Sequence, residues 1–323
     1  MEINRLEVRL KHLSLNTPLI TASGTAGHGD DLTILANYEG ILNSLGAFVT
    51  KGVTLKPKKG NPELRVIETR TGLLNSIGLQ NSGAEVFLRQ ELPGTLDYKL
   101  PIIVNISADT VREFGELASY LVDNDLNGLI SGIEINVSCP NLKEGGVIFG
   151  TNPKAVERVV KAVKKRVGNK VVVITKLTPN VTDVTLSAKA AIQGGTDVLS
   201  MINTLRGMAI DVDARRPLLG NFYGGLSGPA IKPVGICMVY DCFEKIPECK
   251  SKSIPIIGIG GISTWRDAVE YIMAGATAVG IGTAWFVNTK IFEEIKTAIS
   301  GYLHEKNVTI DKLVGVAHEY SRF

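Results

Sequence analysis

Two lysines and three asparagines stand at the ends of short apolar runs in this sequence. Lys51 and Lys176 each end such a run, as do Asn105 and Asn136, and Asn203 follows another. A lysine that emerges from a buried strand is costly to desolvate unless it meets an anion. Any one of these residues could instead cap a helix or form a turn, and either lysine could extend its ammonium into water. Taken together, they predict a binding site for an anionic ligand.

Glycines follow the last two apolar runs of the chain. The segments IIGIGGIS and AVGIGTAWF place Gly260-Gly261 and Gly282-Thr283 after an apolar run and before a helical pattern. Glycine lets a phosphate approach backbone N–H groups closely, and a helix N-terminus favours an anion. Each pair alone could be a simple turn. The two pairs together predict a phosphorylated ligand such as FMN.

One cysteine occupies a position suited to chemistry. Cys139 lies in the segment NVSCPN, between a polar strand end and a proline, where a thiol could act as nucleophile or general base. Cys237 is expected to be a buried apolar side chain, and Cys242 and Cys249 lie in no motif. Because no two cysteines form a C-x-x-C pair and the histidines have no ligand spacing, no iron–sulfur cluster or metal site is expected in this chain.

These residues need a scaffold that brings strand ends together. Several apolar runs are continuous, as in parallel strands buried on both faces, and amphipathic runs separate many of them. Strands are expected at Pro18–Ala22, Ala47–Thr50, Ile102–Asn105, Ile133–Asn136, Val171–Lys176, Val198–Ile202, Pro255–Ile259 and Ala278–Ile281. Helices are expected at Thr110–Val122, Pro153–Val167, Thr182–Ile192, Pro229–Phe243, Thr264–Ala274 and Asn288–Leu303. This order predicts an α/β fold, a (β/α)8 TIM barrel in a single domain over residues 1–323, with its site at the C-terminal ends of the strands.

Three stretches depart from the plain strand–helix repeat. Thr54–Arg70 contains two prolines and a glycine and is expected to form a small hairpin outside the barrel. Cys139–Gly150 and Leu205–Gly228 are expected to be loop insertions at the active site, because long loops in a compact domain usually serve function.

The charge balance narrows the range of partners. Lys and Arg total 35 against 32 Asp and Glu, a net charge of +3 that gives no case for nucleic acid or an anionic membrane surface. No run approaches the roughly 18 apolar residues of a membrane helix, and the N-terminal segment MEINRLEVRLKHLSL lacks a signal-peptide core. A cytoplasmic protein is expected.

Over nearly its whole length the chain resembles the class 1 dihydroorotate dehydrogenases, specifically the catalytic subunit of the B type. The segments that carry the resemblance are ITASGTAGHG, TKGVTLKPKKGNPELR, NSIGLQNSG, EINVSCPNLKEGGVIFGTNP, ITKLTPN, INTLRGMAID, GGLSGPAIKP, IIGIGGIS and AVGIGTAWF. SCPN followed by KEGG and FGTNP is highly specific. The flavin domain of dihydropyrimidine dehydrogenase has histidine where this chain has Asn141, and membrane-bound class 2 enzymes have serine in place of Cys139. Ser76 departs from the pattern, in which alanine is common.

The resemblance implies roles for these residues. Cys139 would take a proton from carbon 5 of dihydroorotate while a hydride passes from carbon 6 to nitrogen N5 of FMN. Lys176 would stabilise the reduced flavin, Lys51 would also be catalytic, and the loop Cys139–Gly150 would close over the substrate. FMN would be bound by Ser23, Lys51, Gly52, Asn105, Asn136, Lys176, Ile202, Gly228, Gly260, Gly261, Gly282 and Thr283. Dihydroorotate or orotate would be bound by Lys51, Asn75, Ser76, Ile77, Gly78, Leu79, Asn136, Asn203 and Thr204.

The resemblance also implies a partner. B-type enzymes pass electrons to NAD through a separate PyrK-like subunit that carries FAD and a [2Fe–2S] cluster, in a heterotetramer with a homodimeric core. Because this chain has no cysteine set for such a cluster, those groups would belong to the partner, and Cys242 and Cys249 would be incidental. The alternatives are a fumarate- or quinone-linked dihydroorotate oxidase, a flavin dehydrogenase of another pyrimidine, or a barrel that binds a phosphorylated ligand without redox chemistry.

Overall fold

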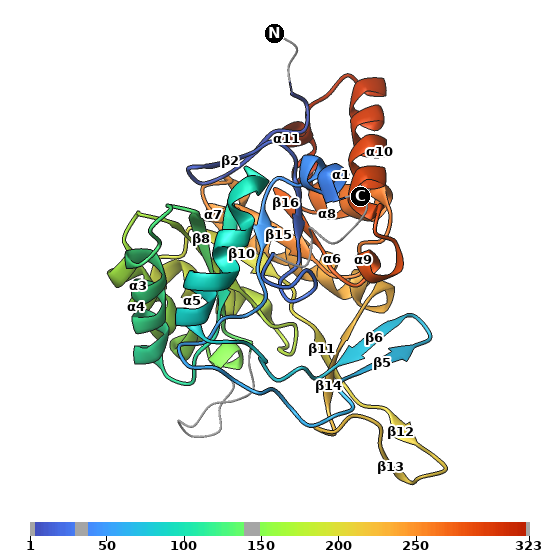
Figure 1. Ribbon diagram of the computed structural model, residues 1–323. Coiled ribbons are helices and arrows are strands. Elements are labelled where there is room, and N and C mark those ends of the chain that lie inside the picture. The colour runs from blue at the N-terminus through green and yellow to red at the C-terminus, as the bar shows by residue number, and fades with distance from the viewer. Residues whose placement is uncertain (1–3, 30–37, 139–148, 321–323) are drawn as a thin grey trace.

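A sheet of eight parallel strands forms the centre of the computed structural model, which describes residues 4–29, 38–138 and 149–320 (Figure 1). The strands are β3 (Leu19–Thr21), β4 (Phe48–Val49), β7 (Ile102–Ile106), β8 (Ile130–Asn136), β9 (Val172–Lys176), β10 (Val198–Met201), β15 (Ile256–Ile259) and β16 (Ala278–Ile281). Their spatial order is β3-β16-β15-β10-β9-β8-β7-β4. A parallel bridge between Ile20 and Ala47 joins the two outer strands, so the sheet closes into the expected barrel.

Continuous burial explains why these runs become barrel strands. Every residue of β7 and of β9 is buried, because one face of each strand points into the barrel and the other packs against helices. All eight strand predictions are confirmed, with bounds that differ by at most three residues.

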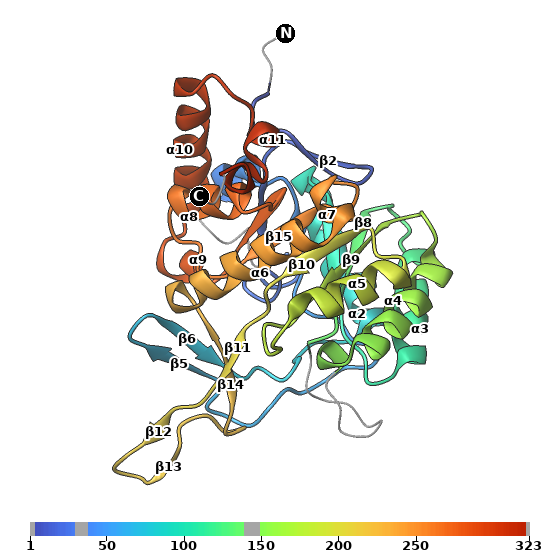
Figure 2. The same cartoon turned by 180° about the vertical axis from the view of Figure 1, so that it is seen from behind.

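Helices cover the outside of the barrel, with α3, α4 and α5 side by side in Figure 2. Those of the described residues are α1 (Tyr38–Ser44), α2 (Ala84–Val86), α3 (Val111–Asp123), α4 (Pro153–Val167), α5 (Val184–Gly194), α6 (Lys232–Lys245), α7 (Pro247–Lys250), α8 (Trp265–Met273), α9 (Ala284–Val287), α10 (Ile291–Glu305) and α11 (Ile310–Leu313). The predicted start of α4 is confirmed: Pro153 is its first residue, and Asn152 Oδ1 accepts a 3.3 Å hydrogen bond from the Ala155 N–H. Within the described ranges, no helix has the length and apolar character that crossing a membrane requires.

A second, antiparallel sheet extends from the C-terminal end of the barrel (Figure 1). It contains β5 (Val66–Thr69), β6 (Gly72–Asn75), β11 (Leu205–Gly207) and β14 (Gly224–Ser227) in the order β11-β14-β6-β5. The predicted hairpin therefore lies later than Thr54–Arg70, at β5–β6. The predicted loop Leu205–Gly228 supplies two strands to this sheet, together with the projecting hairpin of β12 (Ile210–Asp211) and β13 (Arg216–Pro217). Leu205–Gly228 is thus largely structured, since its ends pair with one another and with β6.

A short hairpin closes the opposite end of the barrel. It consists of β1 (Val8–Leu10) and β2 (Leu13–Leu15), whose Leu10 and Leu15 are fully buried. Leu15 lies close to Gly46, just before β4, so the hairpin packs against the N-terminal ends of the strands. The C-terminal end of the barrel is therefore the end at which a functional site is expected.

Candidate functional site

A polar layer lies inside the barrel near the C-terminal ends of its strands. Asn105, Glu134, Lys176 and Ser200 come from the consecutive strands β7 to β10, and none is more than 4% exposed. Glu134 Oε1 accepts a 2.7 Å hydrogen bond from Asn105 Nδ2, and Glu134 Oε2 accepts one of 2.9 Å from Ser200 Oγ. Lys176 Nζ lies 3.7 Å from Glu134 Oε1. Each buried polar group thus has a partner, as burial in an apolar barrel requires.

Contacts across the barrel bring other predicted residues to this layer. Lys176 Nζ donates a 2.8 Å hydrogen bond to Ser23 Oγ, which follows β3. The Asn105 N–H donates to Thr50 Oγ1 at the end of β4, and a Cβ at Gly52 would lie 3.1 Å from Asn105 Oδ1. The structure therefore gathers Ser23, Gly52, Asn105 and Lys176, which the sequence separates widely.

Asn136 and Asn203 form the next part of the site. Asn136 is in register with Lys176, and its Oδ1 accepts a 3.2 Å hydrogen bond from Asn203 Nδ2. The Thr204 N–H donates to Asn203 Oδ1 at 2.7 Å. These amides are therefore held beside the lysine by one another.

The segment Asn75–Leu79 reaches the same mouth from the second sheet. Asn75 Nδ2 donates a 3.1 Å hydrogen bond to the Gly225 carbonyl, and Ser76 Oγ accepts one of 2.8 Å from Asn61 Nδ2. Leu79 adopts a left-handed φ of 58°, which is uncommon outside glycine. The Leu79 side chain reaches the Cα of Gly52 closely enough that a Cβ there would lie 3.3 Å from it. The chain from Asn75 to Leu79, which includes Ile77 and Gly78, thus lies between the second sheet and the end of β4.

The predicted glycines gather after β14, β15 and β16. A Cβ on Gly261 would lie 2.8 Å from the Gly228 carbonyl oxygen, and Thr283 Oγ1 donates a 2.7 Å hydrogen bond to Ser227 Oγ. Gly260 and Gly261 have φ values of 131° and 68°, a region that side chains rarely adopt.

The same turns reach the barrel interior. The Ile202 N–H donates to the Ile259 carbonyl at 2.9 Å, so Ile202 lies beside Gly260. Gly282 has no side chain beside these turns; among the described residues a Cβ there would meet Ala22 at 3.3 Å and Thr25 at 3.5 Å. Glycine turns of this kind suit a phosphate, and the buried lysine suits an anionic group.

An ion pair fixes the turn after β15. Lys232 Nζ, at the start of α6, donates to Asp267 Oδ1 at 2.7 Å, and Asp267 Oδ2 accepts from the Thr264 N–H at 2.8 Å in a capping box of α8. Burial acts to raise the pKa of Asp267, but the hydrogen bonds from Lys232, Ser263 and Thr264 outweigh it and hold that pKa below its usual value. The hydrogen bond to Asp267 raises the pKa of Lys232. Both groups are charged at neutral pH and anchor the glycine turn.

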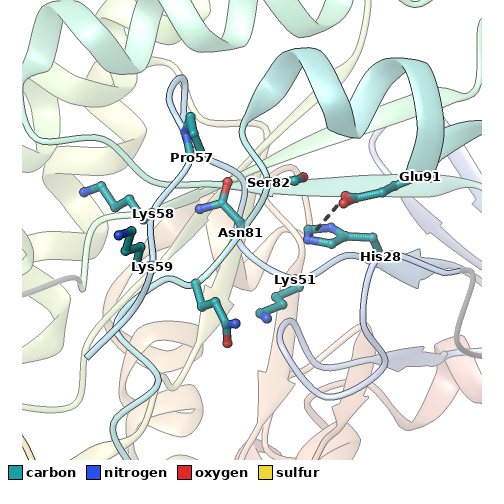
Figure 3. Close-up of a pocket in the computed structure, with 9 residues that line it drawn as sticks. His28, Lys51, Pro57, Lys58, Lys59, Asn81, Ser82 and Glu91 are labelled. Atoms are coloured by element: carbon teal, nitrogen blue, oxygen red, sulfur yellow. Dashed lines mark ion pairs between the residues drawn. The ribbon is translucent and has the colours of Figure 1, made fainter. Parts of the chain in front are cut away.

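Lys51 borders a separate pocket of about 570 Å³ (Figure 3). In this view Lys51 lies close to His28, whose Nε2 is 3.6 Å from Glu91 Oε2, while Lys58 and Lys59 lie on the other side. Lys58 Nζ is itself paired with Asp109 at 2.9 Å. Lys51, which follows β4 at the C-terminal end of the barrel, thus also lines a basic pocket beside the barrel mouth.

Of the three cysteines that the structure describes, one differs from expectation. Cys139 and most of the loop Cys139–Gly150 lie outside the described residues. Cys237 is exposed, so its predicted burial is wrong: the buried Gly235, Val239 and Cys242 share one face of α6 at helical spacing, and Cys237 lies on another. Cys242 and Cys249 are buried, and burial raises the pKa of Cys249 to about 12. Because both thiols are buried, neither lies on the surface where a partner protein could contact it.

Glu134 and Ser200 are the two members of the polar layer that were not predicted from the sequence, and Glu134 is the charged one. It stands within an apolar run, two residues before Asn136, so its side chain shares the strand face of that asparagine. A carboxylate in a strand buried on both faces is rare unless it is paired, and that rarity was the available signal.

Comparisons with known proteins agree with this geometry. A family model described as dihydroorotate dehydrogenase matches residues 5–303. The chain is 48% identical over 311 residues to the catalytic subunit of dihydroorotate dehydrogenase B (NAD(+)) from Thermoanaerobacter sp. (strain X514), covering 96% of this chain and 98% of that protein. The subunits of the same name from Geobacter sp. (strain M21) and Alkaliphilus oremlandii (strain OhILAs) are each 46% identical, over 96% and 98% of this chain and 97% and 99% of their own lengths. The chain belongs to the dihydroorotate dehydrogenase family.

Proposed function

We propose that this chain oxidises (S)-dihydroorotate to orotate in de novo pyrimidine (UMP) biosynthesis, with FMN as its cofactor. The observation that carries the proposal is the buried polar layer around Lys176, at the end of the barrel where TIM-barrel enzymes have their sites. A structural role alone would not require a lysine, a glutamate and an asparagine inside the barrel.

The proposed cofactor site has two parts. Ser23, Lys51, Gly52, Asn105, Asn136, Lys176 and Ile202 would bind the ring system, and Gly228, Gly260, Gly261, Gly282 and Thr283 would bind the phosphate. When bound, FMN would supply the hydride acceptor. Lys176 would hold a positive charge near the ring, where it favours the reduced, negatively charged form.

The substrate would lie at the mouth, against the asparagines. Asn75, Asn136 and Asn203 can each donate to a carboxylate or carbonyl and accept from a ring N–H, which suits a pyrimidine carboxylate. Lys51, Ser76, Ile77, Gly78, Leu79 and Thr204 would complete this site. Oxidation removes a proton from carbon 5 and a hydride from carbon 6, and Cys139 would take the proton as its thiolate.

The electrons would then leave through a second protein. The relatives named above are catalytic subunits of NAD(+)-linked enzymes, which supports a separate electron-transfer subunit for this chain too. We propose that this subunit carries FAD and a [2Fe–2S] cluster, in a heterotetramer around a homodimer of this chain. Co-purification from the native cell, followed by assays for FAD and iron, tests this step.

Anaerobic mixing of the purified chain with substrate tests the proposed function. The protein is expected to be yellow, to release FMN on denaturation, and to lose its visible flavin absorbance with dihydroorotate but not with dihydrouracil. Bleaching by dihydrouracil instead would assign it to another pyrimidine. A colourless protein that takes up no flavin would exclude a redox role.

A further inference from the structure

Glu134 is a buried carboxylate with a defined partner for each oxygen. It is 1% exposed, and its two oxygens accept hydrogen bonds from the side chains of the neighbouring strand β7 and of β10, two strands away. A charged group inside a barrel is stable only when such partners compensate for its lost hydration. The carboxylate is therefore fixed in one orientation.

The carboxylate contacts two residues of the proposed cofactor site, Asn105 and Lys176. Glu134 is in register with Asn105 on β7, and Asn136, two residues later on the same strand face, is in register with Lys176 on β9. Glu134 Oε1 is shared between Asn105 Nδ2 at 2.7 Å and Lys176 Nζ at 3.7 Å. One oxygen thus sets the position of both an amide and an ammonium.

We propose that Glu134 is a positioning residue, whose buried carboxylate holds the Asn105 amide and the Lys176 ammonium in the orientation in which they meet the flavin. This inference rests on the proposed function, which places both residues at the flavin. Glu134 also sets the charge of the site, since its negative charge partly offsets that of Lys176 at the ring. A residue with a packing role alone would do neither.

Two substitutions separate charge from orientation. Glu134→Gln keeps an acceptor for Asn105 and removes the charge, so the midpoint potential of bound flavin is expected to rise while the protein still binds FMN. Glu134→Ala leaves Asn105 Nδ2 and Ser200 Oγ without their acceptor, and the FMN dissociation constant is expected to rise about tenfold or more.

Asp197→Asn is the matched control, because Asp197 pairs with Lys164 at 2.7 Å in a buried position away from the proposed site residues. This control should leave both flavin readouts at the parent values. The inference is overturned if Glu134→Gln leaves the potential unchanged and Glu134→Ala binds FMN as tightly as the parent.

A measurement on the flavin-free protein keeps this inference distinct from the proposed function. Glu134→Gln, Lys176→Met and the double variant are compared by their shifts in melting temperature. Each single substitution removes the ionic partner of the other side chain. The melting temperature of the double variant should therefore shift by less than the sum of the two single shifts. Additive shifts would mean that Glu134 does not hold Lys176. A parent protein that takes up no flavin would contradict the proposed function, and this cycle would still decide the contact.

Discussion

Lys176 Nζ donates a 2.8 Å hydrogen bond to Ser23 Oγ across the interior of the barrel. Lys176 ends β9, Ser23 follows β3, and β10, β15 and β16 lie between these strands in the sheet. The contact exists only because the sheet closes. It places a buried lysine at the mouth where the residues of the proposed cofactor site meet.

Replacing Lys176 should lower the stability of the folded protein and destabilise the reduced form of the bound flavin. Lys176→Met leaves Glu134 buried without its ionic partner, a change that costs about 3–5 kcal/mol in comparable buried pairs. The midpoint potential of bound flavin should fall, because a positive charge beside the reduced ring is lost. Denaturant unfolding and potentiometric titration measure the two effects.

Lys164→Met serves as the control for this change, since it breaks the Lys164–Asp197 pair elsewhere in the barrel. It should alter stability and leave the potential unchanged. A Lys176→Met protein with the parent's potential would count against the role assigned to Lys176.

Gly282→Ala should reduce FMN affinity without unfolding the barrel. Among the described residues, the new methyl group would meet Ala22 at 3.3 Å and Thr25 at 3.5 Å, so a shift of a few tenths of an ångström accommodates it. It would project into the space proposed for the phosphate, and the FMN dissociation constant should rise about tenfold or more in a fluorescence titration. Gly301→Ala on α10, where a Cβ meets nothing within 4 Å, should leave affinity unchanged. Equal affinities for both variants would place the phosphate elsewhere.

Cys139→Ala should slow flavin reduction by dihydroorotate while FMN stays bound. Loss of a general base typically costs about 10²–10⁴ in rate. Anaerobic stopped-flow absorbance measures the step, and Cys237→Ala is the control because Cys237 is exposed on α6. If the Cys139 variant reduces its flavin as fast as the parent at neutral pH, the thiol is not the base.

Asp267→Asn should destabilise the protein at neutral pH and have less effect in acid. Its carboxylate caps α8 and pairs with Lys232, and loss of such a cap costs about 1 kcal/mol. Because the pKa of Asp267 is held below its ordinary value of 3.8, its stabilising effect is complete above pH 3.8 and is lost as the pH falls through the lowered pKa. Urea unfolding at pH 7 and near pH 3 should show the difference between parent and variant shrinking. A constant difference would mean that Asp267 acts without its charge.

The sequence predicted the barrel because local patterns are sufficient for it. Continuous apolar runs such as Ile102–Ile106 are typical of strands buried on both faces, and Asn152-Pro153 is a local helix start. The second sheet has no such pattern. Its strand β14, Gly224–Ser227, has the sequence GGLS and is a strand because it pairs with β11 on one side and, on the other, with β6, about 150 residues earlier.

The site could be predicted as residue types at strand ends, and its internal contacts could not. The hydrogen bond from Lys176 to Ser23 joins residues 153 positions apart, and the role of Glu134 depends on which strands neighbour β8. The exposure of Cys237 depends on the rotation of α6 about its axis, since the surrounding run is apolar on several sides. Long-range geometry decides all three.

A single-turnover product assay tests whether this chain itself oxidises dihydroorotate. The chain alone, with FMN bound and oxygen excluded, is mixed with dihydroorotate in slight excess over flavin, and orotate is quantified by chromatography. One orotate per reduced flavin is expected, with no partner subunit or NAD present. Flavin that stays oxidised, with no orotate formed, would mean that this chain does not oxidise dihydroorotate.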